Sequence, residues 1–263
     1  MKTAISNIAW NMDNDHLIYD LMKKYGYQGL EIAPSRIIPP PASPYDNLDY
    51  ITEWKEALER ERGFSIPSMQ SIWYGRNENI FSTARERDEL IAYTKKAILF
   101  AEQIECNNLV FGCPKNRKVP DNIEPLQIAV PFFQEIAEFA LKHNTVIGLE
   151  AVSAIYNTNF INDTLSAIAF INEVNSKGLK LNLDVGTMIQ NGEDISIIEN
   201  NIYYVNHVHI SEPGLLEIVE RNIHTELSEI LKRKNYDGYI SIEMGKGHNV
   251  ETVMRYISKV FGD

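Results

Sequence analysis

The sequence predicts an α/β fold, a (β/α)8 TIM barrel that forms a single domain over residues 1–263. Short apolar or β-branched runs alternate with longer segments of helical periodicity along the whole chain. Strict alternation implies a parallel sheet, because parallel neighbours need a crossover connection. Eight such units in about 250 residues are typical of a closed barrel. A doubly wound open sheet is the alternative, but the GxGxxG turn that such sheets often carry is absent.

The expected strands are short runs that are each followed by a turn. The prolines at 39–41 and 44 are expected to form a loop after the second strand, and not a domain linker, because the alternation continues beyond them. In chain order the strands cover Thr3–Ala9, Gly29–Ala33, Ile66–Ile72, Asn108–Gly112, Val146–Ala151, Leu179–Val185, Val205–Ile210 and Tyr239–Met244.

The helical segments are identified by apolar side chains that recur on one face. The first has Leu17, Ile18, Leu21 and Met22 at such positions. Basic residues near helix ends suit the negative end of the helix dipole. The clearest helices cover Asp15–Tyr25, Thr83–Glu105, Pro125–His143, Asn162–Ser176, Ile223–Lys234 and Asn249–Val260.

Composition and charge limit the classes of partner. The chain has 44% hydrophobic and 23% charged residues, which is ordinary for a globular protein. A balance of 25 Lys+Arg against 36 Asp+Glu gives a net charge of −11, which argues against nucleic-acid and anionic-membrane partners. No apolar run approaches the roughly 18–20 residues of a membrane span, and the first residues lack a secretory signal. Cys106 and Cys113 alone make no disulfide framework, so we expect a soluble, cytoplasmic protein.

Four successive expected strands end in side chains that can bind a metal. Glu150, Asp184, His209 and Glu243 end the fifth to eighth strands, at what we expect to be the same height. In a (β/α)8 barrel these ends meet at the face where active sites form. Two-residue alternation places small or polar side chains one layer deeper, where an ordinary barrel would carry Val, Ile and Leu; these are Gly148, Asn182, His207 and Ser241.

These strand-end residues predict one divalent metal, held by Glu150, Asp184, His209 and Glu243. Burying three carboxylates together is costly unless a cation neutralises them. A ligand set of mostly hard oxygen favours Mn²⁺ or Mg²⁺, with Co²⁺ or Zn²⁺ also compatible. The alternative is a buried ion network of the same residues without a metal.

The same strand ends resemble a known family. The segments IGLE, LDVG, HVHI and SIEM are similar to those of the xylose-isomerase-like TIM-barrel superfamily of sugar and sugar-phosphate isomerases and epimerases. The resemblance extends over essentially the whole chain, including GYQGLEI and NYDGYISIEM. It implies that Glu150, Asp184, His209 and Glu243 bind the metal, and that Glu150 and Glu243 also act as an acid/base pair on opposite faces of the substrate.

The residue types fit this chemistry. Isomerising or epimerising a ketose requires removal of a proton next to a carbonyl, for which a metal and a carboxylate are suited. We therefore expect a metal-dependent sugar or sugar-phosphate isomerase or epimerase, acting through an enediolate on a small-molecule carbohydrate. A dehydratase of a cyclic polyol or keto acid shares the proton abstraction and is the alternative. Thr187 stands where many family members carry His, so the analogy does not specify the substrate.

Other residues near strand ends are candidates for substrate contact. Lys115 and Arg117 follow the fourth strand and Lys246 follows the eighth, where they could bind a phosphate or another anionic group. The remaining candidates could contact the sugar, although core packing explains each aromatic equally well; they are Trp10, Gln70, Trp73, Tyr156 and Glu212.

Two further functions fit the sequence less well. An AP-site endonuclease would need extra His ligands and a basic groove, but the chain has 6 His and a net charge of −11. A non-catalytic sugar-binding barrel would not need the pair Glu150 and Glu243. His207 is expected inside the barrel, and Glu31 either faces the pocket or pairs with an interior His. The outward face of the helix from Asp88 to Glu105 could support a homo-oligomer.

Overall fold

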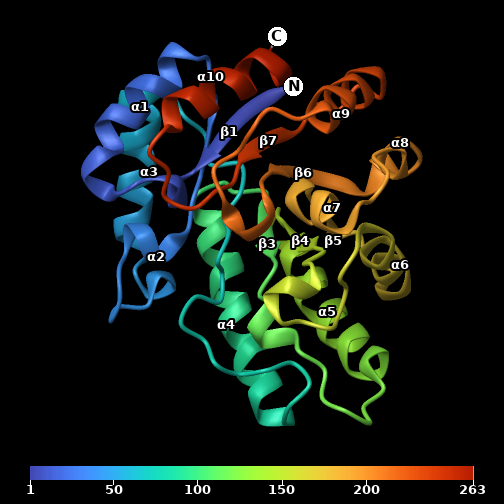
Figure 1. The fold of residues 1–263 in the computed structure, drawn as a ribbon. Coiled ribbons are helices and arrows are strands. Elements are labelled where there is room, and N and C mark those ends of the chain that lie inside the picture. Colours follow the sequence, from blue (N-terminus) through green and yellow to red (C-terminus); the bar gives the residue numbers. More distant parts are fainter. Residues whose placement is uncertain (263) are drawn as a thin grey trace.

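A curled parallel sheet surrounded by helices forms the centre of the computed structural model, which describes residues 1–262 (Figure 1). The strands pair in the order β2-β1-β7-β6-β5-β4-β3, and each pairing is parallel. This is the single-domain TIM barrel that the sequence predicted. The strands are β1 (Lys2–Ser6), β2 (Gly29–Glu31), β3 (Asn108–Phe111), β4 (Val146–Glu150), β5 (Leu179–Asp184), β6 (Val205–Ile210) and β7 (Tyr239–Ile242).

The expected strand Ile66–Ile72 closes the barrel between β2 and β3, but it is irregular. Met69 forms isolated parallel bridges with Ile32 on one side and with Leu109 on the other. Its backbone N–H donates to the carbonyl of Asn108 at 2.9 Å. Pro67 lacks an N–H, which interrupts the ladder and explains why no regular strand forms here. The barrel wall therefore consists of seven regular strands and one extended segment, which is held by isolated bridges.

All six helices for which the sequence gives bounds are present, and residues 1–262 contain four further α-helices for which no bounds were predicted. α3 was missed because its exposed face is highly charged and only Ile51 and Leu58 are buried. α4 begins as the sequence suggests, since the Thr83 side chain accepts a hydrogen bond from the N–H of Glu86. The helices are α1 (Asp15–Lys24), α2 (Pro34–Ile37), α3 (Leu48–Arg62), α4 (Ala84–Gln103), α5 (Pro125–Lys142), α6 (Thr164–Val174), α7 (Val185–Asn191), α8 (Ser196–Asn201), α9 (Asn222–Arg233) and α10 (Val250–Phe261).

The helices form an outer layer that buries one apolar face each against the sheet. The first and last helices, α1 and α10, lie side by side, so both ends of the chain close the same part of the ring (Figure 1). The Tyr27 hydroxyl donates to the carbonyl of Met254 at 3.0 Å across this junction. Within residues 1–262, no helix is long and apolar enough to cross a bilayer.

Candidate active site and metal centre

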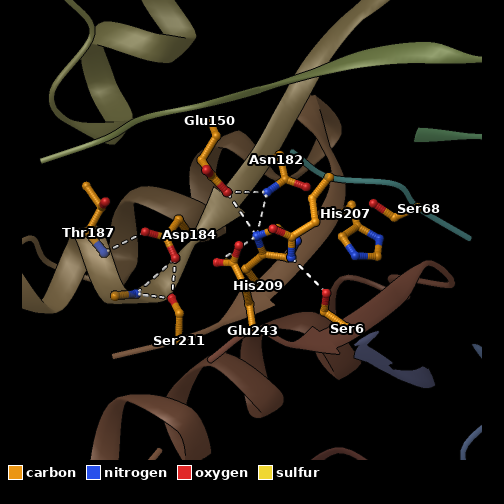
Figure 2. Close-up of polar contacts among 12 residues, drawn as sticks. Ser6, Ser68, Glu150, Asn182, Asp184, Thr187, His207, His209, Ser211 and Glu243 are labelled. Carbon is orange, nitrogen blue, oxygen red and sulfur yellow. Dashed lines mark hydrogen bonds and ion pairs between the residues drawn. The ribbon is translucent and has the colours of Figure 1, made fainter. Parts of the chain in front are cut away.

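Glu150, His209 and Glu243 meet at the C-terminal end of the barrel (Figure 2). His209 Nδ1 lies 2.9 Å from Glu150 Oε1 and 3.2 Å from Glu243 Oε2. One ligand atom from each residue lies within 4.8 Å of the other two, and all three side chains are buried. Side chains from β4, β6 and the end of β7 therefore form one polar cluster.

The four strand-end residues are not all directly opposite one another in the strand pairing. Glu150 pairs with Asn182, whereas Asp184 pairs with His209. Strands in a closed barrel are staggered, so residues that end neighbouring strands need not pair directly. The long Glu150 side chain nevertheless reaches His209 across this offset.

Asp184 lies beside the cluster and also caps the N-terminus of α7. Its carboxylate accepts hydrogen bonds from the backbone N–H of Thr187 at 2.9 Å and of Gly186 at 3.3 Å. The Ser211 hydroxyl donates to the same carboxylate (Figure 2). Asp184 lines the same cavity as Glu150 and Glu243, although its oxygens are outside the 4.8 Å group.

Three further buried side chains orient the cluster, those of Glu31, Asn182 and Gln70. Glu31 Oε2 lies 2.9 Å from His209 Nε2, so that the other ring nitrogen of His209 faces Glu150 and Glu243. Asn182 Nδ2 donates to Glu150 Oε1 at 2.8 Å, and Gln70 Nε2 donates to Glu31 Oε1 at 3.1 Å. A carboxylate behind a ligating histidine fixes the ring orientation in many metal sites.

His207 is buried inside the barrel, as expected. Its Nε2 lies 3.1 Å from Glu31 Oε2, within ion-pair distance, but the geometry is not that of a hydrogen bond and this nitrogen has no other partner. Burial lowers the pKa of His207, although Glu31 acts in the opposite direction. His207 therefore adds little positive charge to the centre.

Burial and mutual repulsion raise the pKa values of the three carboxylates that face the cavity. Burial raises the pKa of Glu150, and the nearby charge of Glu243 raises it further. Burial also raises the pKa of Glu243 and of Asp184. Each carboxylate is therefore less easily ionised than an exposed one, because neighbouring negative charge and the lost hydration both disfavour its anion.

His209 and Glu31 are shifted toward their charged forms. Burial disfavours the imidazolium, but the carboxylates of Glu243, Glu31 and Glu150 outweigh it and hold the pKa of His209 well above its usual range. Burial likewise opposes ionisation of Glu31, but the two imidazoles outweigh it and hold its pKa well below the usual range. One cationic ring thus stands among several carboxylates.

The donor set fits a divalent cation. His209 Nδ1 faces oxygens of two carboxylates, a position that a proton or a metal ion can occupy. The carboxylates of Glu31, Glu150, Asp184 and Glu243 outnumber the cations of the centre, and excess buried negative charge is very costly without a counter-ion. Oxygen donors with one imidazole are typical ligands for Mn²⁺ or Mg²⁺.

A cavity of about 280 Å³ opens directly onto this centre. Its size is near the lower end of the ~300–1,000 Å³ of small-molecule sites. Within residues 1–262, no Lys or Arg lines it. The lining residues are Gln70, Ser71, Trp73, Tyr74, Val110, Gly112, Cys113, Pro114, Asn116, Glu150, Val152, Tyr156, Asp184, Leu215 and Glu243.

Three of the candidates for substrate contact line this cavity: Gln70, Trp73 and Tyr156. Trp10 and Lys246 instead line a separate cavity of about 250 Å³ beside α1. The Trp10 indole N–H donates to Asp15 Oδ1 at 2.7 Å. The structure therefore divides the aromatic candidates between two sites.

The remaining polar candidates point elsewhere. Lys115 is exposed, and its Nζ bonds Asn77. Glu212 is buried and paired with Arg221, with Glu212 Oε2 2.6 Å from Arg221 Nη2. Arg117 is fully buried behind the cavity wall, where its Nη1 donates to the carbonyl of Glu150 at 2.9 Å. Burial lowers the pKa of Arg117 to about 10.

Several residues of the site were not identified from the sequence as site residues. Ser211 follows His209 by two positions, so the two-residue alternation could have placed it on the inward face. Tyr74 lies in a turn and Leu215 ends a short 3-10 helix (Pro213–Leu215), and neither segment has a periodic signal. Cys113 lines the cavity, but burial raises the pKa of its thiol to about 12, which does not favour a nucleophile.

Solved structures of several enzymes share this fold at low sequence identity. A 3-keto-D-glucoside 4-epimerase from E. coli is 18% identical, with a TM-score of 0.76, covering 98% of this chain and 97% of that chain. A D-psicose 3-epimerase from Clostridium cellulolyticum is 18% identical, with a TM-score of 0.74 and coverages of 99% and 90%. A probable 3-DHS dehydratase from Bacillus anthracis is 18% identical, with a TM-score of 0.68 and coverages of 100% and 99%.

These likenesses establish the fold and not the substrate. No curated protein matches the sequence. The sequence model of the xylose isomerase-like TIM barrel matches residues 19–260, which is most of the chain. The chain therefore belongs to the xylose isomerase-like TIM-barrel family.

Proposed function

We propose that this protein is a metal-dependent epimerase or isomerase of a small carbohydrate, which works by proton abstraction next to a carbonyl. One observation carries the proposal: Glu150 and Glu243, from strands separated by β5 and β6, meet at His209 Nδ1 beside a small cavity. Two carboxylates on different sides of a bound substrate suit removal and return of a proton. The activities of the epimerases with similar folds support the same class.

Glu150, Asp184, His209 and Glu243 would hold one divalent metal. Mn²⁺ and Mg²⁺ fit the oxygen donors best, and Co²⁺ or Zn²⁺ are compatible. When bound, such a metal stabilises negative charge on the oxygens of a substrate next to the reacting carbon.

The side chains of the protein supply the base and its orientation. Glu150 or Glu243 removes the proton, and the other carboxylate serves the opposite face of the substrate. Burial raises the pKa of both, which makes each carboxylate a stronger base than an exposed glutamate once it is ionised. The hydrogen bond from Asn182 holds Glu150 Oε1 at 2.8 Å and restricts the rotation of that carboxylate.

Gly112 provides the room for Glu150. A Cβ at position 112 would lie 2.6 Å from Glu150 Oε2, closer than side-chain atoms normally approach. The absence of a side chain on Gly112 therefore lets the Glu150 carboxylate occupy its position at the cavity wall. The rings of Trp73 and Tyr156 complete the wall, where the apolar face of a sugar can pack.

The charges around the cavity favour an uncharged substrate. Lys115, Arg117 and Lys246 are not among its lining residues, so no Lys or Arg side chain within residues 1–262 offers a phosphate or carboxylate a partner there. A dehydratase of a keto acid would need such a partner for its substrate. The epimerase or isomerase class is therefore preferred over a dehydratase of a keto acid, and a dehydratase of an uncharged cyclic polyol stays the alternative.

Proton exchange with solvent tests the proposal. The Mn²⁺-loaded protein would be incubated in D₂O with a panel of ketoses, ketose phosphates and keto acids. We expect deuterium to enter an uncharged ketose at a carbon next to its carbonyl. Glu150→Gln and Glu243→Gln should each lower kcat by about 10²–10⁴-fold, the usual contribution of a positioned general base.

Metal content must be measured in the same samples, because both glutamates are also proposed ligands. Near-normal turnover in metal-loaded Glu150→Gln and Glu243→Gln would leave metal binding as their only role. That result would contradict the acid/base mechanism. Exchange only into a keto acid would favour the dehydratase instead.

A further inference from the structure

A second cavity of about 240 Å³ adjoins the catalytic cavity. Ser71 and Tyr74 line both cavities, so the two spaces are neighbours on the same face of the barrel. The second cavity is similar in volume to the first, at about 280 Å³. Its other walls come from α2, the proline-rich loop, the turn that follows Ser71 and the middle of α4; the residues are Ser35, Pro40, Pro41, Ala42, Ser43, Pro44, Tyr45, Ile72, Gly75, Arg76 and Tyr93.

The wall between the cavities is a tight turn that is held at both ends. Ser71 has a φ of 54°, which is uncommon for a residue other than glycine, and its carbonyl accepts the N–H of Tyr74 at 2.9 Å. On one side, the Gln70 side chain donates a hydrogen bond to Glu31, which lies beside His209 in the first cavity's polar cluster. The Tyr45 hydroxyl donates to the carbonyl of Ile72 at 2.8 Å on the other side. Tyr74, which is 64% exposed, therefore lines both spaces from this turn.

The second cavity offers hydrogen-bonding groups without net charge. Arg76 Nη2 lies 2.5 Å from Glu78 and 4.0 Å from Glu89, so its charge is already balanced. Arg76 Nε is nevertheless buried and has no hydrogen-bond partner. Ser43 Oγ is also buried and has no hydrogen-bond partner. Burial raises the pKa of the nearby Tyr93 phenol, and Ser43 lowers that pKa by a smaller amount.

Apolar surface makes up much of the rest. Three prolines, Ala42, Tyr45 and Tyr93 line the cavity, and the Arg76 guanidinium lies 4.8 Å from the centroid of the Tyr93 ring. Apolar walls with a few neutral donors and acceptors suit the C–H faces and hydroxyls of a sugar ring. A phosphate or carboxylate would instead require an unpaired cation, which this cavity does not provide among the described residues.

We propose that the second cavity is a subsite for a second sugar ring, so that the preferred substrate is a glycosylated ketose. This inference rests on the proposed function. The reacting ketose unit lies over Glu150 and Glu243, and the attached sugar lies beyond Tyr74 against Arg76 and Ser43. The subsite adds binding energy remote from the reacting carbon, which can raise kcat/KM without any change in the chemistry.

The test compares ketoses with and without an attached sugar. Deuterium exchange by the Mn²⁺-loaded protein would be measured with D-fructose, palatinose (a 6-O-glucosyl fructose) and lactulose (a 4-O-galactosyl fructose). We expect kcat/KM for at least one disaccharide to exceed that for D-fructose by about tenfold or more. Ala42→Trp would fill the second cavity from an exposed position, and it should remove this advantage while leaving exchange with D-fructose unchanged.

Ala84→Trp is the matched control, because Ala84 is exposed at the start of α4 and lines neither cavity. Ser43→Ala tests the hydroxyl with a smaller change, and it should lower kcat/KM for the disaccharide only. Exchange with D-fructose but with neither disaccharide, or an equal effect of Ala42→Trp on all three sugars, would overturn the subsite and leave the proposed function intact.

Absence of exchange with these three sugars and with every ketose of the wider panel would instead refute the proposed function. Calorimetric titration with palatinose then still decides the subsite. Binding that Ala42→Trp abolishes and Ala84→Trp preserves would support it, and binding that is absent or equal in both variants would reject it.

Discussion

Gly112→Ala tests the geometry of the proposed base with the smallest possible change. The new Cβ would lie 2.6 Å from Glu150 Oε2, whereas ordinary van der Waals contact begins at 3.4 Å. The difference is 3.4 − 2.6 = 0.8 Å, and the carboxylate is the part that can move because it ends a flexible side chain. A misplacement of about 1 Å can cost on the order of 10²-fold in rate. We therefore expect kcat to fall by about 10²-fold.

The assay is deuterium exchange into the best ketose by Mn²⁺-loaded protein, with metal content and thermal unfolding measured in parallel. The thermal midpoint should change little, because Gly112 does not have a left-handed φ and alanine can adopt its backbone conformation. Glu150→Gln is the matched background. If Gly112 acts through the Glu150 carboxylate, Gly112→Ala should have little further effect in Glu150→Gln, since coupled residues are not additive. Unchanged kcat in the single variant, or full additivity in the double variant, would refute this reasoning.

Three further predictions follow from the described contacts. Asp184→Asn keeps a side-chain acceptor for the backbone N–H groups at the start of α7 but removes the negative charge. Elemental analysis should therefore show less bound Mn²⁺ than in the wild type, at an unchanged helix content. Equal metal content in the two proteins would remove Asp184 from the ligand set. Burial lowers the pKa of His224 to about 4, so the unfolded chain binds its proton first as pH falls and stability is lost between about pH 6.5 and 4. From pH 7 to pH 5 this group should cost about 2 kcal/mol in urea unfolding, and His224→Gln should lack that part of the loss. Lys115→Ala and Lys246→Ala should leave KM for the ketose unchanged, because neither side chain lines the catalytic cavity; a raised KM would show that one of them contacts the substrate.

Periodicity was sufficient to predict the barrel and the face that carries the candidate site. Glu150, Asp184, His209 and Glu243 were assigned to strand ends because parallel topology brings all C-terminal ends of the strands to one face. Local signals were weaker where composition opposes them. The helix Leu48–Arg62 buries only Ile51 and Leu58. The extended segment around Met69 contains a proline, so it pairs with its neighbours through isolated bridges and not as a regular strand.

Loop residues show the limit of sequence reasoning most directly. Lys115, Arg117 and Lys246 were assigned to an anion site from their positions after strands. The structure exposes the first, buries the second against backbone carbonyls and places the third at another cavity. Loops have no repeating pattern, so the direction of a side chain there depends on packing against distant elements.

The sequence by itself therefore determined the fold, the face that carries the site and the types of side chain available there, because these follow from periodic burial and from the direction of parallel strands. Only the tertiary structure decided how those side chains meet. Glu31 reaches His209 across 178 positions of the chain, and Glu150 reaches His209 although the two are not directly opposite in the strand pairing. Contacts between residues so far apart depend on barrel closure and packing, which no local pattern of residues records.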